Sequence, residues 1–325
     1  MKGRRVLSSA PAKLIITGEH AVVYNEPAIV CAIDKRVKVS VSPRESDEIY
    51  VFSDAFGFPL AIGLDRVSEG LSHPQYGYVF YVIGLVFESV GERPKPLNIE
   101  ITSEAPVGVG LGSSASLAVS LSAGLLRFLG YELEERQLFK ISMEAERFAH
   151  KNPSGVDVTI AMHGGVIAYR KNEPYVELKA PKPLKFIVTD SGKKRATREM
   201  VEKVAALLDK HHDPVRLVMH AIGHLSIQAG ILIRKGDYQG LGRLLTMNHW
   251  LLASLGVSTP ELDRIVYTSL ENGALGSKLT GAGGGGCAIS LPDEGAESYL
   301  LNALSKLGPS FVAEVETEGV RVEEL

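Results

Sequence analysis

The chain has 325 residues, of which 45% are hydrophobic and 22% charged. This balance is typical of a globular protein long enough for about two domains. The formal net charge of −3 gives no reason to expect a nucleic acid as a partner. The two cysteines, Cys31 and Cys287, form no CxxC pair, which argues against a disulfide framework and against a thiolate zinc site.

The N-terminal segment MKGRRVLSSAPAK is basic but lacks the apolar run of a signal peptide. The longest apolar runs are shorter than the roughly 20 residues that span a bilayer. We therefore expect a cytoplasmic protein with no membrane partner.

The first half of the chain mixes strands and helices. Residues 5–55 read as β-rich, and the segment 53–77, which has no clear period, is interpreted as an insertion or an active-site loop. A strand, LNIEITSEA, then leads into a glycine cluster. The elements expected after the cluster are a helix over 113–129 that ends at Gly130, a helix over about 133–150, a turn at 153–157 and two strands ending near 171–174.

The pattern changes after about residue 182 and becomes largely helical. A strand, KFIVTD, comes first, and a pair of strands flanks a second glycine cluster. Because neither half alternates strictly between strand and helix, we expect an α+β fold with domains at 1–180 and 181–325. The helices predicted in the second half cover about 195–211, 214–235, 237–255, 259–272 and 294–307.

The first glycine cluster, PVGVGLGSSAS, follows a strand and opens onto a helix. Such a position presents backbone N–H groups and the positive end of the helix dipole to an anion. Its glycines let a phosphate approach the backbone, and its first serines offer one hydroxyl to cap the helix and one to reach a metal-bound phosphate. We take the whole cluster as a candidate phosphate-binding loop: Pro106, Val107, Gly108, Val109, Gly110, Leu111, Gly112, Ser113, Ser114, Ala115 and Ser116.

Two better-known phosphate loops are excluded here. A Walker loop needs GK[ST], which the cluster lacks, and the dinucleotide fingerprint needs G-x-G-x-x-G, whereas this stretch runs G-x-G-x-G into two serines. The structural alternative is a tight turn with packing glycines. Three alternating glycines followed by two serines favour phosphate binding.

The second glycine cluster, KLTGAGGGGC, contains Gly281, Ala282, Gly283 and Gly284. Four consecutive glycines are costly to order, so such a run is expected where backbone lies close to a ligand or to another loop. A flexible linker is the alternative, but apolar strand-like residues flank the run and disfavour it.

Lys13 lies in an apolar strand within APAKLIITGEHAVVY, and Glu19 and His20 follow in a turn. A lysine in an apolar strand is costly unless an anion pairs with it. An edge-strand lysine that points to solvent explains the pattern equally well.

Asp157 closes the turn NPSGVD, and Glu146 lies eleven residues earlier near a helix end. An aspartate in such a turn most commonly caps backbone N–H groups. Glu146, taken alone, could be an ordinary solvated glutamate.

Three motifs follow one another along the chain: APAKLIITGEHAVVY is the first, PVGVGLGSSAS the second and KLTGAGGGGC the third. In this order they resemble the signatures of the GHMP small-molecule kinases, and the resemblance covers essentially the whole chain. The turn GEHAVVY after Pro-Ala-Lys, together with NPSGVD and NHWLLASLGVSTPEL, is similar to the members that phosphorylate mevalonate, in particular their short archaeal branch. Galactokinases differ in the first motif. The resemblance implies a ribosomal-protein-S5-domain-2-like N-terminal domain and a ferredoxin-like C-terminal domain.

By residue-to-residue match, the resemblance implies that Asp157 is the catalytic base and that Lys13 orients the substrate hydroxyl. It implies that Ser114 and Glu146 bind Mg²⁺, whose preference for hard oxygen donors they suit. Val158 departs from the family, which often has a polar residue at this position.

The remaining matches concern the substrate side of the site. Glu19, His20 and Thr197 match residues near the substrate. The loop Pro106–Ser116 matches the triphosphate loop, which implies that these residues bind ATP, and Gly281–Gly284 matches a loop that closes over the site.

The resemblance implies transfer of the γ-phosphate of ATP to the 5-hydroxyl of mevalonate, by a homodimer that uses Mg²⁺. The nearest alternative is a sister reaction of the family, such as phosphorylation of the 3-hydroxyl, of phosphomevalonate or of a sugar. A non-catalytic sensor on this fold is disfavoured because no transfer residue is lost. A metal site at His220 and His224 is disfavoured because no acidic or cysteine ligand lies at motif spacing.

Overall fold

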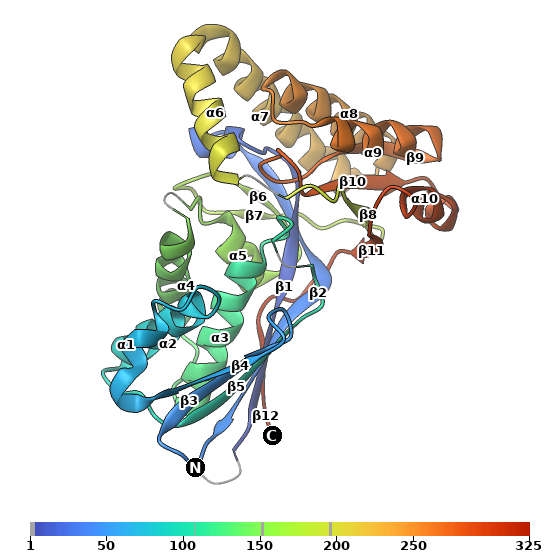
Figure 1. The fold of residues 1–325 in the computed structure, drawn as a ribbon. Coiled ribbons are helices and arrows are strands. Elements are labelled where there is room, and N and C mark those ends of the chain that lie inside the picture. Colours follow the sequence, from blue (N-terminus) through green and yellow to red (C-terminus); the bar gives the residue numbers. More distant parts are fainter. Residues whose placement is uncertain (1–3, 107, 151–152, 195–196) are drawn as a thin grey trace.

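A computed structural model describes residues 4–106, 108–150, 153–194 and 197–325. Figure 1 shows two sheets with helices packed on each, and the described termini lie near one another at one end of the molecule. This mixture of segregated strands and helices agrees with the predicted α+β fold.

The larger sheet, here called sheet A, has the strand order β12-β1-β2-β5-β3-β4, and β6 and β7 extend it beside β2. Its pairs are antiparallel except β3 with β5. The predicted β-rich N-terminal region is thereby confirmed. The strands of sheet A are β1 (Val6–Thr17), β2 (Ala28–Pro43), β3 (Glu48–Ser53), β4 (Pro59–Gly63), β5 (Leu97–Ser103), β6 (Val166–Tyr169), β7 (Val176–Glu177) and β12 (Arg321–Glu324).

The first strand, β1, changes character along its length. Its first residues alternate between buried and partly exposed, whereas every residue from Ala10 to Thr17 is buried. The second half is buried on both faces: Leu14 and Ile16 join a core cluster with Phe186 and Ile289 from the second half of the chain, and Ile15 on the other face joins a cluster with Ile160. Pro11 is tolerated inside the strand because the pairing register with β2 shifts at this position.

Sheet A carries a layer of helices on one side, seen together in Figure 1. Helix α3 (Ser113–Leu129) packs directly on β1 and β2 and contacts α2 (Gly77–Val90), α4 (Glu135–Ala149) and α5 (Val156–His163). The prediction for α3 is confirmed, including its end at Gly130, whose φ of 94° is the left-handed conformation of a C′ residue.

Two predictions in this half are changed by the structure. The segment 53–77, interpreted as an insertion or an active-site loop, contains regular elements: β4, a 3₁₀ turn (Leu64–Arg66) and the short helix α1 (Val67–Gly70). The two strands expected after the turn at 153–157 are wrong, because α5 comes first and only β6 follows before residue 171. Gly155, at φ 89°, lets the chain turn straight into α5.

The second sheet, here called sheet B, has the order β11-β8-β10-β9, and its pairs are antiparallel. Helices α8 and α9 pack on β9, and α10 packs on β8 and β11. The strands are β8 (Lys185–Asp190), β9 (Ala274–Leu279), β10 (Cys287–Pro292) and β11 (Ser310–Glu314), and the helices of this half are α6 (Thr197–Lys210), α7 (His212–Lys235), α8 (Tyr238–Ser254), α9 (Pro260–Glu271) and α10 (Glu297–Leu304).

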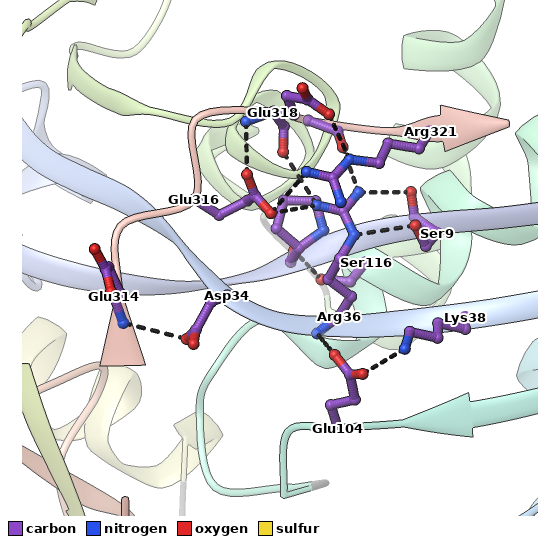
Figure 2. A network of polar contacts seen from close by, with 12 residues as sticks. Ser9, Asp34, Arg36, Lys38, Glu104, Ser116, Glu314, Glu316, Glu318 and Arg321 are labelled. Carbon is purple, nitrogen blue, oxygen red and sulfur yellow. Dashed lines mark hydrogen bonds and ion pairs between the residues drawn. The ribbon is translucent and has the colours of Figure 1, made fainter. Parts of the chain in front are cut away.

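The chain crosses between the two sheets twice. The first crossing follows β7, between residues 178 and 184. The domain boundary that we predicted near residue 180 stays a prediction. The second crossing, residues 315–320, brings β12 back to pair with β1. Figure 2 shows how buried Arg36 of β2 holds this crossing: its guanidinium donates to the Glu316 carboxylate at 3.2 Å and to the Glu318 carbonyl at 3.2 Å.

Candidate active site

A cavity of about 1020 Å³ lies among the helices of sheet A and α6. It brings together residues that are far apart in the sequence. The glycines at 108, 110 and 112 line it beside Ser114, Glu146, Asp157 and Thr197. Residues of the 53–77 segment, among them Ser53, Phe56 and Gln75, line it as well, so this segment belongs to the wall of the cavity.

The glycine loop connects β5 to α3 and is pinned to β1. The Lys13 N–H donates to the Leu111 carbonyl at 2.8 Å, and the Ser116 hydroxyl donates to the Pro11 carbonyl at 2.7 Å. Gly112 must be glycine because its φ is 75° and a Cβ there would lie 2.7 Å from the Lys13 side chain. Val107, which we also predicted in this loop, lies outside the described residues.

Lys13 and Asp157 form an ion pair at the cavity wall. The Lys13 ammonium lies 3.0 Å from an Asp157 carboxylate oxygen. The Lys13 side chain is only 5% exposed, whereas that of Asp157 is 33% exposed. The solvent-directed alternative for Lys13 is therefore excluded, and the carboxylate is the partner that can reach a ligand in the cavity.

Asp157 lies in the first turn of α5, where the helix dipole favours negative charge. The turn before it is held by the Tyr169 hydroxyl, which donates to the Ser154 carbonyl. Val158, the departure from the family pattern, is buried in a cluster with Ala10 and Val119. Its apolar side chain packs in this cluster and also lines the cavity beside Asp157.

Glu146, near the end of α4, is a buried carboxylate rather than a solvated one. Burial raises its pKa, and the charge of Asp157 raises it further. His150, at 4.0 Å, and hydrogen bonds from Tyr78 and Ser114 partly offset these effects. The site is therefore one in which a cation beside Glu146 would be stabilised electrostatically.

The donor set fits Mg²⁺. Ser114 and Glu146 offer hard oxygen atoms at one edge of the cavity, and their hydrogen bond shows that they are adjacent. The described residues contain no group of three His, Cys, Asp or Glu side chains that could hold a metal alone. Mg²⁺ usually takes one or two protein carboxylates and completes its shell with water and substrate phosphates, so two donors beside a phosphate loop suffice.

Glu19 and His20 are not among the residues that line this cavity, and their place on the substrate side stays a prediction. The Glu19 carboxylate is buried and pairs with the Lys278 ammonium, and it also accepts from the Asn248 amide at 3.1 Å. His20 has a backbone φ of 60°, uncommon outside glycine, and its Nε2 lies 2.9 Å from the Ala282 carbonyl. These contacts join the first and third motifs.

Lys278 and Tyr78 are the two residues that our sequence reading missed. Lys278 stands in the apolar strand β9, so the cost argument applied to Lys13 would have flagged it as well. Tyr78 lies in α2, and the sequence analysis predicted no helix or strand for the residues of α2. No sequence signal separates its hydroxyl from those of the neighbouring tyrosines.

The glycine run of the third motif packs against other loops. The Gly284 N–H donates to the Val257 carbonyl at 2.8 Å, and the Gly286 N–H donates to the Lys193 carbonyl at 3.0 Å. A Cβ on Gly283 would lie 2.1 Å from the Val257 carbonyl oxygen. This confirms the expectation of close backbone contact, here with neighbouring loops. The loop that contains Lys193 leads to Thr197, which begins α6 at the cavity.

The rival metal site has no support among the described residues. His220 Nδ1 lies 2.6 Å from the Glu26 carboxylate and its Nε2 accepts from Arg216 at 3.2 Å. Both ring nitrogens of His220 are therefore engaged by protein side chains.

One helix among the described residues, α7, is long and apolar enough to cross a membrane by length and composition alone. It packs against α6, α8 and strands β1, β2 and β6. Core helices of globular proteins pass the same test, and these contacts account for its apolar character.

Comparison with known proteins agrees with this geometry. The family "GHMP kinases N terminal domain" matches residues 77–165, and "GHMP kinases C terminal" matches residues 231–310. The chain belongs to the GHMP kinases. As a GHMP kinase it is a phosphotransferase that acts on a small molecule.

Curated relatives of this GHMP kinase are named mevalonate kinases. The one from Thermococcus sibiricus is 35% identical, and the alignment covers 99% of each chain. The one from Archaeoglobus fulgidus is 36% identical, over 98% of this chain and 100% of the relative. The crystal structure of the Methanococcus jannaschii mevalonate kinase superposes with a TM-score of 0.84 at 29% identity, over 100% of this chain and 98% of that one.

Proposed function

We propose that this GHMP kinase transfers the γ-phosphate of ATP to the 5-hydroxyl of mevalonate, with Mg²⁺ as cofactor. The observation that carries the proposal is the meeting of three groups in one cavity: the phosphate loop, the Ser114–Glu146 donor pair and the Lys13–Asp157 ion pair. Full-length similarity to mevalonate kinases supports the choice of substrate.

In this proposal Asp157 is the general base. Its carboxylate faces the cavity while Lys13 lies behind it, so it can accept the proton of a substrate hydroxyl placed between it and the γ-phosphate. The Lys13 ammonium then offsets negative charge on the developing alkoxide. Because phosphoryl transfer has a loose transition state, the main task of these residues is to position the hydroxyl.

The loop amides from Gly108 to Ser114, at the N-terminus of α3, would hold the phosphates of ATP. Ser114 and Glu146 would hold Mg²⁺, which when bound neutralises charge on the phosphate oxygens. His20 and Thr197 are proposed to lie on the substrate side. Glu19, whose carboxylate is occupied by Lys278 and Asn248, is proposed to fix the turn that presents His20. The loop Gly281–Gly284 is proposed to keep the substrate side closed.

A substrate panel with product analysis tests the proposal. Purified protein is incubated with Mg·ATP and mevalonate, phosphomevalonate, homoserine or galactose, and the phosphorylated position is read by ³¹P and ¹H NMR. We expect phosphate on the 5-oxygen of mevalonate. Transfer to the 3-oxygen or preference for another acceptor would replace this function with a sister activity of the family.

Three further expectations from the family stay proposals. A homodimeric state is testable by light scattering of the purified protein. A cytoplasmic location is testable by cell fractionation. Domains at 1–180 and 181–325 are testable by limited proteolysis near residue 180, after which the pairing of β12 with β1 should keep the two fragments associated.

A further inference from the structure

The Tyr78 hydroxyl lies between two parts of the proposed metal site. It is 2.9 Å from Glu146 Oε1 and 3.1 Å from the backbone carbonyl oxygen of Ser114. Tyr78 comes from α2, Ser114 from the first turn of α3, and Glu146 from α4. One side chain thus joins the three helices that form this edge of the cavity.

The hydroxyl is a fixed donor. A tyrosine phenol has an ordinary pKa of about 10 and keeps its proton at neutral pH. A tyrosine hydroxyl has a single proton to donate, and both neighbouring oxygen atoms are acceptors. With an ionised Glu146, the bond to the carboxylate is the charge-assisted and stronger one.

We infer that Tyr78 is a positioning residue for the metal site: its hydroxyl holds the Glu146 carboxylate in the orientation that Mg²⁺ needs beside Ser114. The inference rests on the proposed function, because it takes Glu146 as a metal ligand. Outer hydrogen-bond partners of this kind fix the rotamer of a ligating carboxylate. Tyr78 also lines the cavity, and in this role it acts on the metal through Glu146.

A purely structural role for Tyr78 predicts a different result. If the hydroxyl only tied α2 to α3 and α4, its loss would lower thermal stability and reduce the active fraction. The metal affinity of the folded protein would then stay unchanged. A positioning role instead weakens metal binding in protein that is fully folded.

The test compares Tyr78→Phe with Tyr131→Phe. Tyr131 donates to Glu92 at 2.8 Å, so this variant also removes one tyrosine–glutamate hydrogen bond, but neither residue lines the cavity. Mn²⁺ binding is measured by electron paramagnetic resonance in the presence of a non-hydrolysable ATP analogue, and folding is checked by thermal unfolding. We expect Mn²⁺ affinity to fall by about tenfold or more in Tyr78→Phe and to stay unchanged in Tyr131→Phe.

Steady-state kinetics give a second readout. In Tyr78→Phe the Mg²⁺ concentration for half-maximal rate should rise by a similar factor, excess Mg²⁺ should restore most of the rate, and the mevalonate KM should stay the same. Wild-type Mn²⁺ affinity in folded Tyr78→Phe would overturn the inference. Failure of the proposed function is distinguishable, because Glu146→Gln would then leave Mn²⁺ binding intact as well.

Discussion

Two lysine–carboxylate pairs meet near the second half of β1, and their surroundings differ. Lys13 and Asp157 lie at the cavity wall, and the carboxylate side chain is 33% exposed. Lys278 and Glu19 are sealed, with side chains 0% and 1% exposed. The Lys278 ammonium also donates to the Leu279 carbonyl at 2.6 Å.

Because of this difference, we assign the pair at the cavity wall to catalysis and the sealed pair to holding the fold together. Asp157 has an open side through which it can exchange a proton with a ligand. Glu19 has none, because Lys278 and Asn248 occupy its oxygen atoms. The Thr280 hydroxyl next to this pair donates to the Ile15 carbonyl at 3.1 Å, so the sealed pair helps to dock β9 and the third motif onto the strand that carries Lys13.

Removing the proposed base should give the largest effect. We expect Asp157→Asn to lower kcat by about 10² to 10⁴, the usual range for loss of general-base catalysis. Nucleotide affinity, measured by calorimetry, should stay close to that of the wild type. Asp213→Asn, at a side chain that is 95% exposed, is the matched control and should behave as wild type. Normal turnover by Asp157→Asn would remove it from the mechanism.

Breaking the sealed pair should act on stability. We expect Lys278→Met to lower the free energy of unfolding by about 3 to 5 kcal/mol, because it leaves the Glu19 charge buried without a partner. The double variant Glu19→Gln/Lys278→Met should recover part of this loss, as both charges are then gone. Urea denaturation measures all three proteins.

An exposed pair provides the control for that experiment. Lys38→Met breaks the surface pair of Lys38 with Glu104 and should cost no more than about 1 kcal/mol. A double variant as unstable as Lys278→Met alone would contradict the view that the buried pair is held by charge compensation.

Ser114 tests the proposed metal site, and its loss should have a smaller effect than breaking either pair. Ser114→Ala should weaken the apparent affinity for Mg²⁺ in the presence of ATP by about tenfold, the lower end of the losses known for partners of metal sites. The mevalonate KM serves as an internal control and should not change. An unaltered Mg²⁺ dependence of the rate would exclude Ser114 as a ligand.

The smallest effect concerns His249, which lies beside the sealed pair. Its Nδ1 accepts from the Leu279 N–H at 3.2 Å, and its Nε2 lies 3.1 Å from the Asp263 carboxylate. Burial lowers its pKa below the ordinary value of 6.5; Asp263 counteracts this, and Lys278 adds to it.

Because the folded state resists protonation of His249, the unfolded state binds more protons just below pH 6.5. Its contribution to stability is therefore complete above pH 6.5 and is lost as the pH falls below that value. The loss is about 1.4 kcal/mol for each unit by which the pKa of His249 is lower in the folded state than in the unfolded state. Melting temperatures between pH 5 and 8 should fall less steeply on the acid side in His249→Gln than in the wild type. Exposed His212→Gln should leave the slope unchanged.

Local patterns predicted much of the fold. Helix α3 and its end at Gly130 followed from the small-residue apolar run and the glycine stop. Helix α2 could not be predicted in the same way, because its residues are apolar on nearly all sides and lack a helical period. Only the tertiary structure, which buries it between α3, α4 and sheet A, shows that this run is a helix.

The candidate site was only partly readable from the sequence. The phosphate loop follows from backbone chemistry, whereas the pairing of Lys13 with Asp157 joins residues separated by most of the first half of the chain. The ion pair between Glu19 and Lys278 depends on how the two sheets pack against each other. Such long-range partners are set by packing, so a motif names the residues without saying which of them face the cavity.

Single-turnover rates of phosphate transfer, measured by rapid quench with Asp157→Asn and Glu19→Gln at a temperature where both are folded, test the division between the two pairs most directly. We expect transfer in Asp157→Asn to be slower by at least about 10². In Glu19→Gln it should slow by less than about tenfold, under 1.4 kcal/mol of barrier, while stability falls. The reverse order, with transfer lost in Glu19→Gln and retained in Asp157→Asn, would contradict the assignment of chemistry to the pair at the cavity wall.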